Sequence, residues 1–223
     1  NQYVFTREDK VQNVVNTESF GIGIRVIANG TWGFASTNSV TEDGIKKATE
    51  QAVAIAKANS KIQTDPVKLA PVNAYGEVSW KTPITKDFKE VPVSEKVDLL
   101  LTANAAALDN GADYVNSALF MVNEQKYFAS TDGSYIDQDN HRLWPTFRVT
   151  AIDKAKGNFK TRENMSAPVG MGYEYLDGLE SEKLDGPAGL RLYRNSYDMV
   201  EDATIAAKQA KEKLTAKSVD AGK

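Results

Sequence analysis

The feature that most constrains the fold of this sequence is the pair Asn29 and Gly30, which stands between two short runs of strand character. Asn followed by Gly suits the two positive-φ positions of a type I′ turn, whose twist matches that of the strands it joins. Residues 22–26 place Ile, Ile and Val at every second position, and residues 31–35 form the returning run. The sequence therefore predicts a β-hairpin centred on this pair.

The glycines of the first strand, Gly21 and Gly23, resemble part of a dinucleotide-binding fingerprint. The third glycine of that fingerprint is missing, and the segment runs into a hairpin instead of opening a helix. We therefore exclude a cofactor loop here. Glycine inside a strand is typical of a close approach, and we expect another backbone or an aromatic ring such as Trp32 to lie against these positions.

Three segments combine the apolar spacing of helices with suitable residues at their ends. The first is expected between the N-cap Thr41 and residues 59–60. The second follows Pro92 and ends at residues 110–111, where Asn and Gly favour a left-handed terminus. The third begins at Asp198 and gathers lysines toward its carboxyl end, which complements the helix dipole. Each helix should bury one face.

A second group of strands is predicted over residues 112–152, with turns at 123–124 and 132–133 and a return through 147–151. Strands that cluster between helices, and do not alternate with them one by one, favour antiparallel pairing. The expected fold class is therefore α+β, with an antiparallel β-sheet, formed by the hairpin and a meander, packed by about three helices.

Two segments are harder to assign from their composition. Residues 73–91 have little periodicity and are either a loop or an edge element packed on the sheet. Residues 168–189 are rich in Gly and include the acidic run 177–185, which indicates a long ordered loop or a linker.

The composition is that of a folded protein without a basic surface. Hydrophobic residues make up 41% and charged residues 26% of the 223 residues, and the net charge is −3 with both signs mixed along the chain. This balance argues against nucleic acid or an anionic membrane as a partner. No apolar run approaches the roughly 20 residues that span a bilayer. A cytoplasmic location is favoured, but Asn1 is not a natural first residue, so an exported precursor stays open.

The side chains available for catalysis are few, because the chain has one histidine, His141, and no cysteine. Cys–His catalysis and multi-His zinc sites are therefore excluded within these residues. The best candidate for a metal site is Asp137, Asp139 and His141, which alternate along a predicted strand and so share one face. The alternative interpretation is a solvated strand edge.

Two further groups of residues have the composition of candidate sites. Ser134 follows Asp132 and Gly133, but without a nearby base the three residues indicate a type I′ turn and not a nucleophile. Tyr173, Glu174 and Tyr175 combine aromatic and polar groups in the glycine-rich segment and are candidates for a peptide groove. Ordinary packing of this loop against the sheet is the alternative.

The hairpin and two later segments together carry a resemblance. Residues 19–27, with their two glycines and Arg25, followed by the run NGTWGFAS at 29–36, are similar to the opening hairpin of the TldD/PmbA family. Residues 170–174 and 201–203 follow in the order of that family. The chain thus resembles the amino-terminal part of a TldD/PmbA-type zinc metallopeptidase.

The resemblance implies an amino-terminal α+β domain over residues 1–190, and a helix over 191–223 that leads to a carboxyl-terminal domain beyond Lys223. In the catalytic branch, an HExxxH helix and a later Cys hold zinc in that second domain, and the Glu acts as general base. No cofactor is expected in the present segment, which alone is expected not to be catalytic. The family normally places a helix and a strand ahead of Tyr3.

The functional expectation is that this segment is the scaffold and substrate-chamber domain of a zinc-dependent peptidase acting on unfolded peptides. The expected partners are a peptide substrate and a second subunit, in a homodimer or a TldD/PmbA-type heterodimer. The family's other branch lacks the zinc motif, so a non-catalytic PmbA-like partner subunit or a peptide-binding or assembly module is the alternative. The mildly acidic charge gives no support to an association with DNA gyrase.

Overall fold

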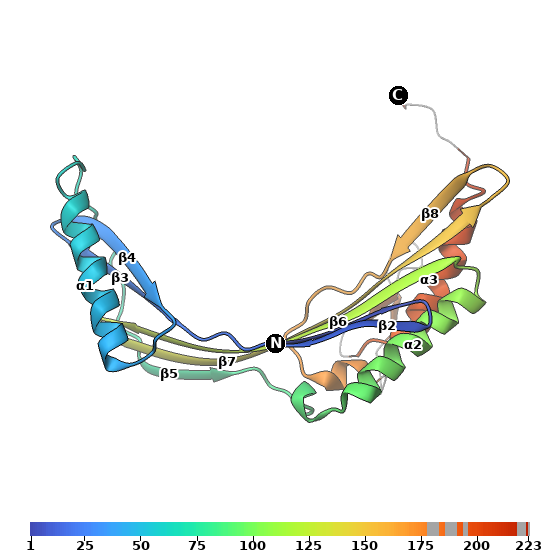
Figure 1. Ribbon diagram of the computed structural model, residues 1–223, viewed down its shortest axis with the longest axis horizontal. Coiled ribbons are helices and arrows are strands. Elements are labelled where there is room, and N and C mark those ends of the chain that lie inside the picture. Colours follow the sequence, from blue (N-terminus) through green and yellow to red (C-terminus); the bar gives the residue numbers. More distant parts are fainter. Residues whose placement is uncertain (178–182, 186–190, 194–195, 218–221, 223) are drawn as a thin grey trace. The chain divides into compact units, whose positions relative to one another are not determined.

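The computed structural model describes residues 1–177, 183–185, 191–193, 196–217 and 222, with only the backbone described at 183–185 and 191–193. The chain divides into two units. One comprises Asn1–Thr17 and Tyr75–Lys223, and we call it the sheet unit. The other comprises Glu18–Ala74, and we call it the hairpin unit (Figure 1). The expected α+β class is confirmed, with three α-helices among the described residues.

The hairpin unit confirms the turn predicted from the sequence. Strands β3 (Ile22–Ala28) and β4 (Thr31–Thr37) pair in antiparallel register across a two-residue loop. Asn29 has φ 52° and Gly30 φ 74°, the two positive values that a type I′ turn requires. Helix α1 (Glu42–Asn59) covers one face of the hairpin, and the Thr41 side chain caps its first turn, as expected.

Within the hairpin unit, α1 approaches the sheet most closely at Gly33 of β4, a position that the sequence did not indicate as a contact. A Cβ added there would lie 1.9 Å from the carbonyl oxygen of Ala52, so the helix backbone rests directly on β4. Ala48 and Ala52 pack against Ala35 at this contact. At Gly23 the expected aromatic neighbour is present, but it is Phe34, whose ring edge would lie 3.1 Å from an added Cβ.

The sheet unit is built on a six-stranded sheet in the order β2-β1-β6-β7-β5, with β8 also paired to β7. Its strands are β1 (Gln2–Arg7), β2 (Lys10–Asn16), β5 (Gly76–Lys81), β6 (Tyr114–Ser130), β7 (Ser134–Asp153) and β8 (Asn158–Glu163). The pairings are antiparallel except that between β5 and β7. The segment left open between a loop and an edge element therefore contains an edge strand.

One predicted turn of the meander is wrong. Residues 123–124 lie inside β6, which pairs with β7 in unbroken register from Tyr114 to Ser130. The polar pair stays in the strand because Asn123 hydrogen-bonds across to β7. The turn at 132–133 is confirmed, but it is a three-residue loop in which Gly133 alone has positive φ, at 90°, so it is not type I′.

Helices α2 (Val93–Asp109) and α3 (Met199–Lys213) pack on one another and against the sheet (Figure 1). Their predicted ends are confirmed, because α2 begins after Pro92 and ends at Asn110, and the Asp198 side chain caps α3. Two 3₁₀ helices, η1 (Phe88–Glu90) and η2 (Tyr173–Leu176), complete the core. Short strands β9 (Lys183–Asp185) and β10 (Arg191–Tyr193) pair with each other.

The structure describes part of the glycine-rich segment. Residues 168–177 are described, whereas 178–182 and 186–190, with most of the acidic run, lie outside the described residues. No helix in the described part of the chain is long and apolar enough to cross a membrane.

Candidate functional site

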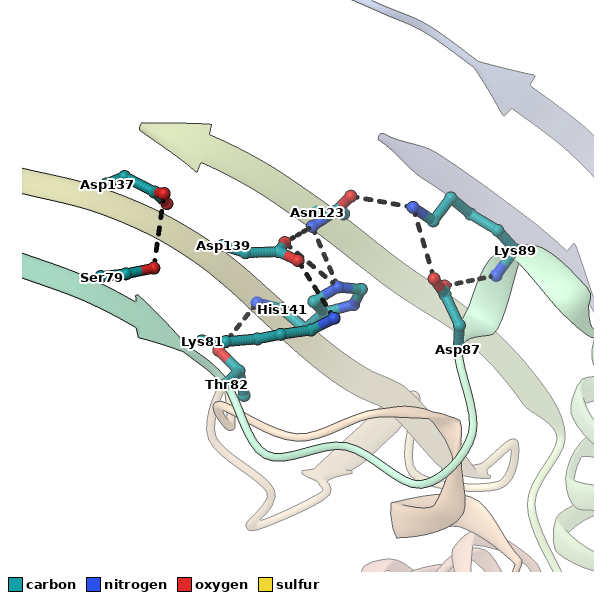
Figure 2. Close-up of polar contacts among 9 residues, drawn as sticks. All are labelled: Ser79, Lys81, Thr82, Asp87, Lys89, Asn123, Asp137, Asp139 and His141. Carbon is teal, nitrogen blue, oxygen red and sulfur yellow. Dashed lines mark hydrogen bonds and ion pairs between the residues drawn. The ribbon is translucent and has the colours of Figure 1, made fainter. Parts of the chain in front are cut away.

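The one histidine, His141, lies on β7 in a cluster of polar side chains (Figure 2). Side chains alternate along a strand, so Asp137, Asp139 and His141 share the face of the buried Leu143. His141 is only 3% exposed, and its ring meets Phe88 edge-on with the centroids 6.3 Å apart. The strand is therefore not a fully solvated edge at this point.

The His141 ring is bonded through Asn123 on the neighbouring strand. The Lys89 ammonium donates to Asn123 Oδ1 at 2.9 Å, which places the Asn123 amide nitrogen toward β7. That Nδ2 donates to Asp139 Oδ1 at 2.5 Å and lies 3.0 Å from His141 Nε2. His141 Nε2 also lies 3.4 Å from Asp139 Oδ1. His141 Nδ1 has no partner among the described groups.

The charged residues around the ring are paired with each other. Asp139 Oδ2 lies 3.6 Å from Lys81 Nζ, and Lys89 Nζ lies 3.3 Å from Asp87 Oδ2 (Figure 2). Asp137 takes a different partner, since Ser79 Oγ donates to its carboxylate at 3.3 Å. The structure thus brings Asp139 and His141 together but leaves the third predicted ligand apart.

This arrangement does not fit a metal centre. Zinc sites need at least three converging protein ligands, and here the described residues provide only one carboxylate beside one imidazole. Across the described part of the chain, no group of three or more His, Cys, Asp or Glu residues is placed to hold a metal ion. Beside the ring, the Thr82 hydroxyl accepts a hydrogen bond from the His141 backbone nitrogen at 3.0 Å.

The second set of candidates, Tyr173, Glu174 and Tyr175, lies in η2 and is largely buried. Tyr173 is 2% and Tyr175 is 3% exposed, and both belong to the hydrophobic core. The Glu174 carboxylate accepts hydrogen bonds from the backbone nitrogens of Lys86, at 2.9 Å, and Gly172, at 3.0 Å. These contacts lock the glycine-rich segment to the segment before η1, as expected for ordinary loop packing.

A buried cation that the sequence did not indicate, Lys96, lies next to these Glu174 contacts. Lys96, on α2, has no exposed surface, and its ammonium donates to the Phe88 carbonyl at 2.6 Å and to Gln2 Oε1. The rings of Phe88 and Tyr173 lie 5.6 and 6.0 Å from it. Burial lowers the pKa of Lys96 and raises that of Tyr173. A lysine on a helix gives no sequence signal of burial, so this site could not be predicted.

Comparison with known proteins decides the family. Residues 1–56 match the family model described as PmbA/TldA metallopeptidase domain 1, and residues 86–217 match the model of the central domain of the same family. The chain belongs to the TldD/PmbA metallopeptidase family. The resemblance carried by the hairpin at 19–36 is thereby confirmed.

Curated relatives of this TldD/PmbA chain are described as metalloproteases. A metalloprotease of Methanothermobacter thermautotrophicus is 24% identical over 213 residues, which cover 91% of this chain and 44% of the relative. A TldD homologue of Buchnera aphidicola is 32% identical over 145 residues, covering 61% of this chain and 27% of the relative. The chain thus spans less than half the length of the relatives it matches.

Solved structures with the same fold include proteins from three organisms. A protein of Thermotoga maritima described as a modulator of DNA gyrase matches with a TM-score of 0.64 and 15% identity, over 99% of this chain and 44% of its own. A similarly described protein of Bacteroides thetaiotaomicron matches with 0.63 and 13%, over 98% and 44%. TldE from Thermococcus kodakarensis matches with 0.58 and 12%, over 94% and 41%. At these identities the matches show the fold.

Proposed function

We propose that this chain is the amino-terminal, non-catalytic part of a zinc-dependent peptidase that acts on unfolded peptides, and that it forms a wall of the substrate chamber. The main support is that the chain matches domain 1 and the central domain of a metallopeptidase family. Within this chain, the residues nearest to a metal site, Asp139 and His141, already bond to protein groups (Figure 2). Under this proposal the zinc ligands belong to a further, carboxyl-terminal domain.

A chamber wall that binds peptides of many sequences must bind them through their main-chain groups. Open strand edges offer the hydrogen-bonding groups for this. The edge of a sheet presents unpaired N–H and C=O groups to which an extended peptide can add as another strand. In the sheet unit, β2 is such an edge, and all its residues except Val15 are exposed. In the hairpin unit, β3 and β4 pair only with each other among the described residues.

The second candidate function is that of a non-catalytic PmbA-like partner subunit or a peptide-binding module. It is favoured by the likeness in fold to TldE, a protein whose name sets it apart from TldD. In either role the proposed assembly is a dimer, formed by two copies or by a TldD/TldE-type pair.

The test is to compare the protein encoded by the parent reading frame with this 223-residue chain. Each is incubated with reduced, unfolded casein, with zinc or with a chelator, and products are detected by mass spectrometry. We expect zinc-dependent cleavage by the parent protein and none by the chain. A parent protein that binds no zinc and cleaves only after a second subunit is added would replace the first function by the second.

A further inference from the structure

The hairpin unit has an open strand edge at β4. In a two-residue hairpin the residues flanking the loop, Ala28 and Thr31, form a hydrogen-bonded pair, so every second residue from Trp32 onward directs its N–H and C=O away from β3. Asn59 on α1 donates to the Trp32 carbonyl at 3.1 Å. The outward backbone groups of Phe34 and Ser36 have no hydrogen-bond partner in the described part of the chain.

A pocket of about 370 Å³ lies beside this edge, in the size range of small-molecule and side-chain sites. Its walls are largely apolar, and Trp32, Phe34 and Ile55 keep 40%, 53% and 37% of their surface exposed. The residues that line it come from both strands and from α1: Arg25, Trp32, Gly33, Phe34, Ile55 and Asn59.

Arg25 gives the pocket its charge. Its guanidinium lies 5.6 Å from the centre of the Trp32 ring, so a cation–π contact positions it over the aromatic wall. No carboxylate lies within ion-pair distance of Arg25 among the described residues, and none lines the pocket. The complementary group for such a pocket is a carboxylate, which a guanidinium binds by charge-assisted hydrogen bonds.

We propose that the β4 edge and the Arg25 pocket form a binding site for an extended acidic peptide. The peptide backbone pairs with Phe34 and Ser36 as an added strand. Side chains at alternate positions of that strand face the same side, so an apolar residue enters beside Trp32 and Ile55 while an acidic residue two positions away meets Arg25. The identification of this peptide as a substrate rests on the proposed function, whereas the binding site itself does not.

Other parts of the molecule fit such a peptide less well. The β2 edge is exposed, but the two hollows found among the described residues both lie in the hairpin unit. A second hollow in the hairpin unit, of about 550 Å³, is lined by Gly21, Ile22, Gly23, Ser36, Thr37 and Asn38 and carries no charge. Of these two hollows among the described residues, the Arg25 pocket is the one that joins an open edge, an apolar wall and an unpaired cation.

The test measures binding of a fluorescein-labelled decapeptide to the chain. Its even-numbered positions alternate between Glu and Val, and its odd-numbered positions are Thr. A matched peptide has Gln in place of each Glu. We expect Arg25→Gln to weaken binding of the Glu peptide about tenfold, the scale of one charge-assisted hydrogen bond, and to leave the Gln peptide unchanged. Arg25→Lys, which keeps the charge but not the planar fork, should fall between. Arg142→Gln, a change in the sheet unit, is the control.

A second variant tests the strand addition. Ser36→Pro removes an outward N–H without removing a bond to β3, so it should weaken both peptides. Hydrogen exchange should show that the hairpin persists in this variant and that residues 31–37 become protected when peptide binds to the unmodified chain. The proposal is overturned if the Glu peptide binds the Arg25→Gln variant and the unmodified chain equally, or if neither peptide binds. It is also overturned if the unmodified chain self-associates and Ser36→Pro abolishes this, because the β4 edge would then pair with a second copy.

These measurements also separate the two proposals. Peptide binding by this chain, together with a parent protein that cleaves nothing, would leave the binding site standing and remove the peptidase function. Zinc-dependent cleavage by the parent protein, with no peptide binding at Arg25, would do the reverse.

Discussion

Replacing Gly33 with Ala should destabilise the hairpin unit. In an ordinary strand, the same change from Gly to Ala stabilises the protein. Glycine inside a strand usually costs about 0.5–1 kcal/mol relative to Ala, because it loses more backbone entropy on folding. At Gly33, however, the new methyl group would lie 1.9 Å from the Ala52 oxygen and 2.7 Å from the Ala56 nitrogen. Both atoms belong to the backbone of α1, so no side-chain rotation can relieve the overlap.

The expected loss of stability in Gly33→Ala follows from the short distance between β4 and the backbone of α1. To restore a 3 Å separation, α1 must move away from β4 by about 1 Å, since overpacking is relieved only by such shifts. Ala48, Ala52 and Ala56 are at most 4% exposed, so the movement would open the whole interface. Overpacking costs about 1–3 kcal/mol, and we expect about 2–3 kcal/mol here.

Gly23→Ala is the matched control, because its new methyl group meets a side chain and not a backbone. The Phe34 ring edge lies 3.1 Å away but is half exposed and can turn aside. We expect a change within about 0.5 kcal/mol. Urea unfolding in a Trp80→Phe, Trp144→Phe background would leave Trp32 as the reporter of the hairpin unit. A Gly33→Ala protein as stable as Gly23→Ala would refute the backbone contact.

Three further predictions concern the sheet unit. Burial lowers the pKa of Lys96 in the folded chain, so the unfolded chain holds more protons and stability should rise with pH toward 10.5, the ordinary lysine pKa. Lys96→Met should lose this rise in urea midpoints. Tyr197→Phe removes the 2.7 Å hydrogen bond to buried Asp202 and should cost about 1–3 kcal/mol in chemical denaturation, whereas Tyr114→Phe, at an exposed site, should cost almost nothing. Calorimetry of the tag-free chain with zinc, manganese or calcium should show no saturable heat, and a heat that disappears in Asp139→Asn would restore the metal interpretation.

The sequence predicted the elements whose signals are local. The turn at Asn29 and Gly30 and the caps at Thr41 and Asp198 are determined by neighbouring residues, and the structure confirms each of them. The same holds for the second helix, which begins directly after Pro92. Such signals depend on backbone geometry and capping alone, so no knowledge of the tertiary fold is needed to interpret them.

The amino-terminal strands could not be found in this way. β1 has apolar side chains on both faces, because Val4 enters the core while Tyr3 and Phe5 contact Phe120 on the opposite face. This arrangement removes the period-two alternation that marks a half-buried strand. The turn that follows uses Glu8 at φ 47°, a conformation for which Glu gives no sequence signal.

The contacts within the polar cluster could not be predicted from the sequence for a related reason. Asn123 was assigned to a turn because of its residue type, yet it fills a position opposite His141 in a continuous strand. The spacing of Asp137, Asp139 and His141 correctly placed them on one face, but only their cross-strand partners decide which of them converge. Some of those partners are distant in sequence, so spacing alone could name these residues as candidates for a metal site but could not predict the hydrogen bonds that the structure shows.

The central claim, that this chain binds peptides but does not cleave them, is tested most directly by peptidase activity of the purified chain. The chain is incubated with a peptide library, with added zinc or with a chelator, and the peptides are analysed by mass spectrometry. The account predicts no new termini under either condition. Zinc-dependent cleavage that a chelator stops and His141→Ala abolishes would contradict it.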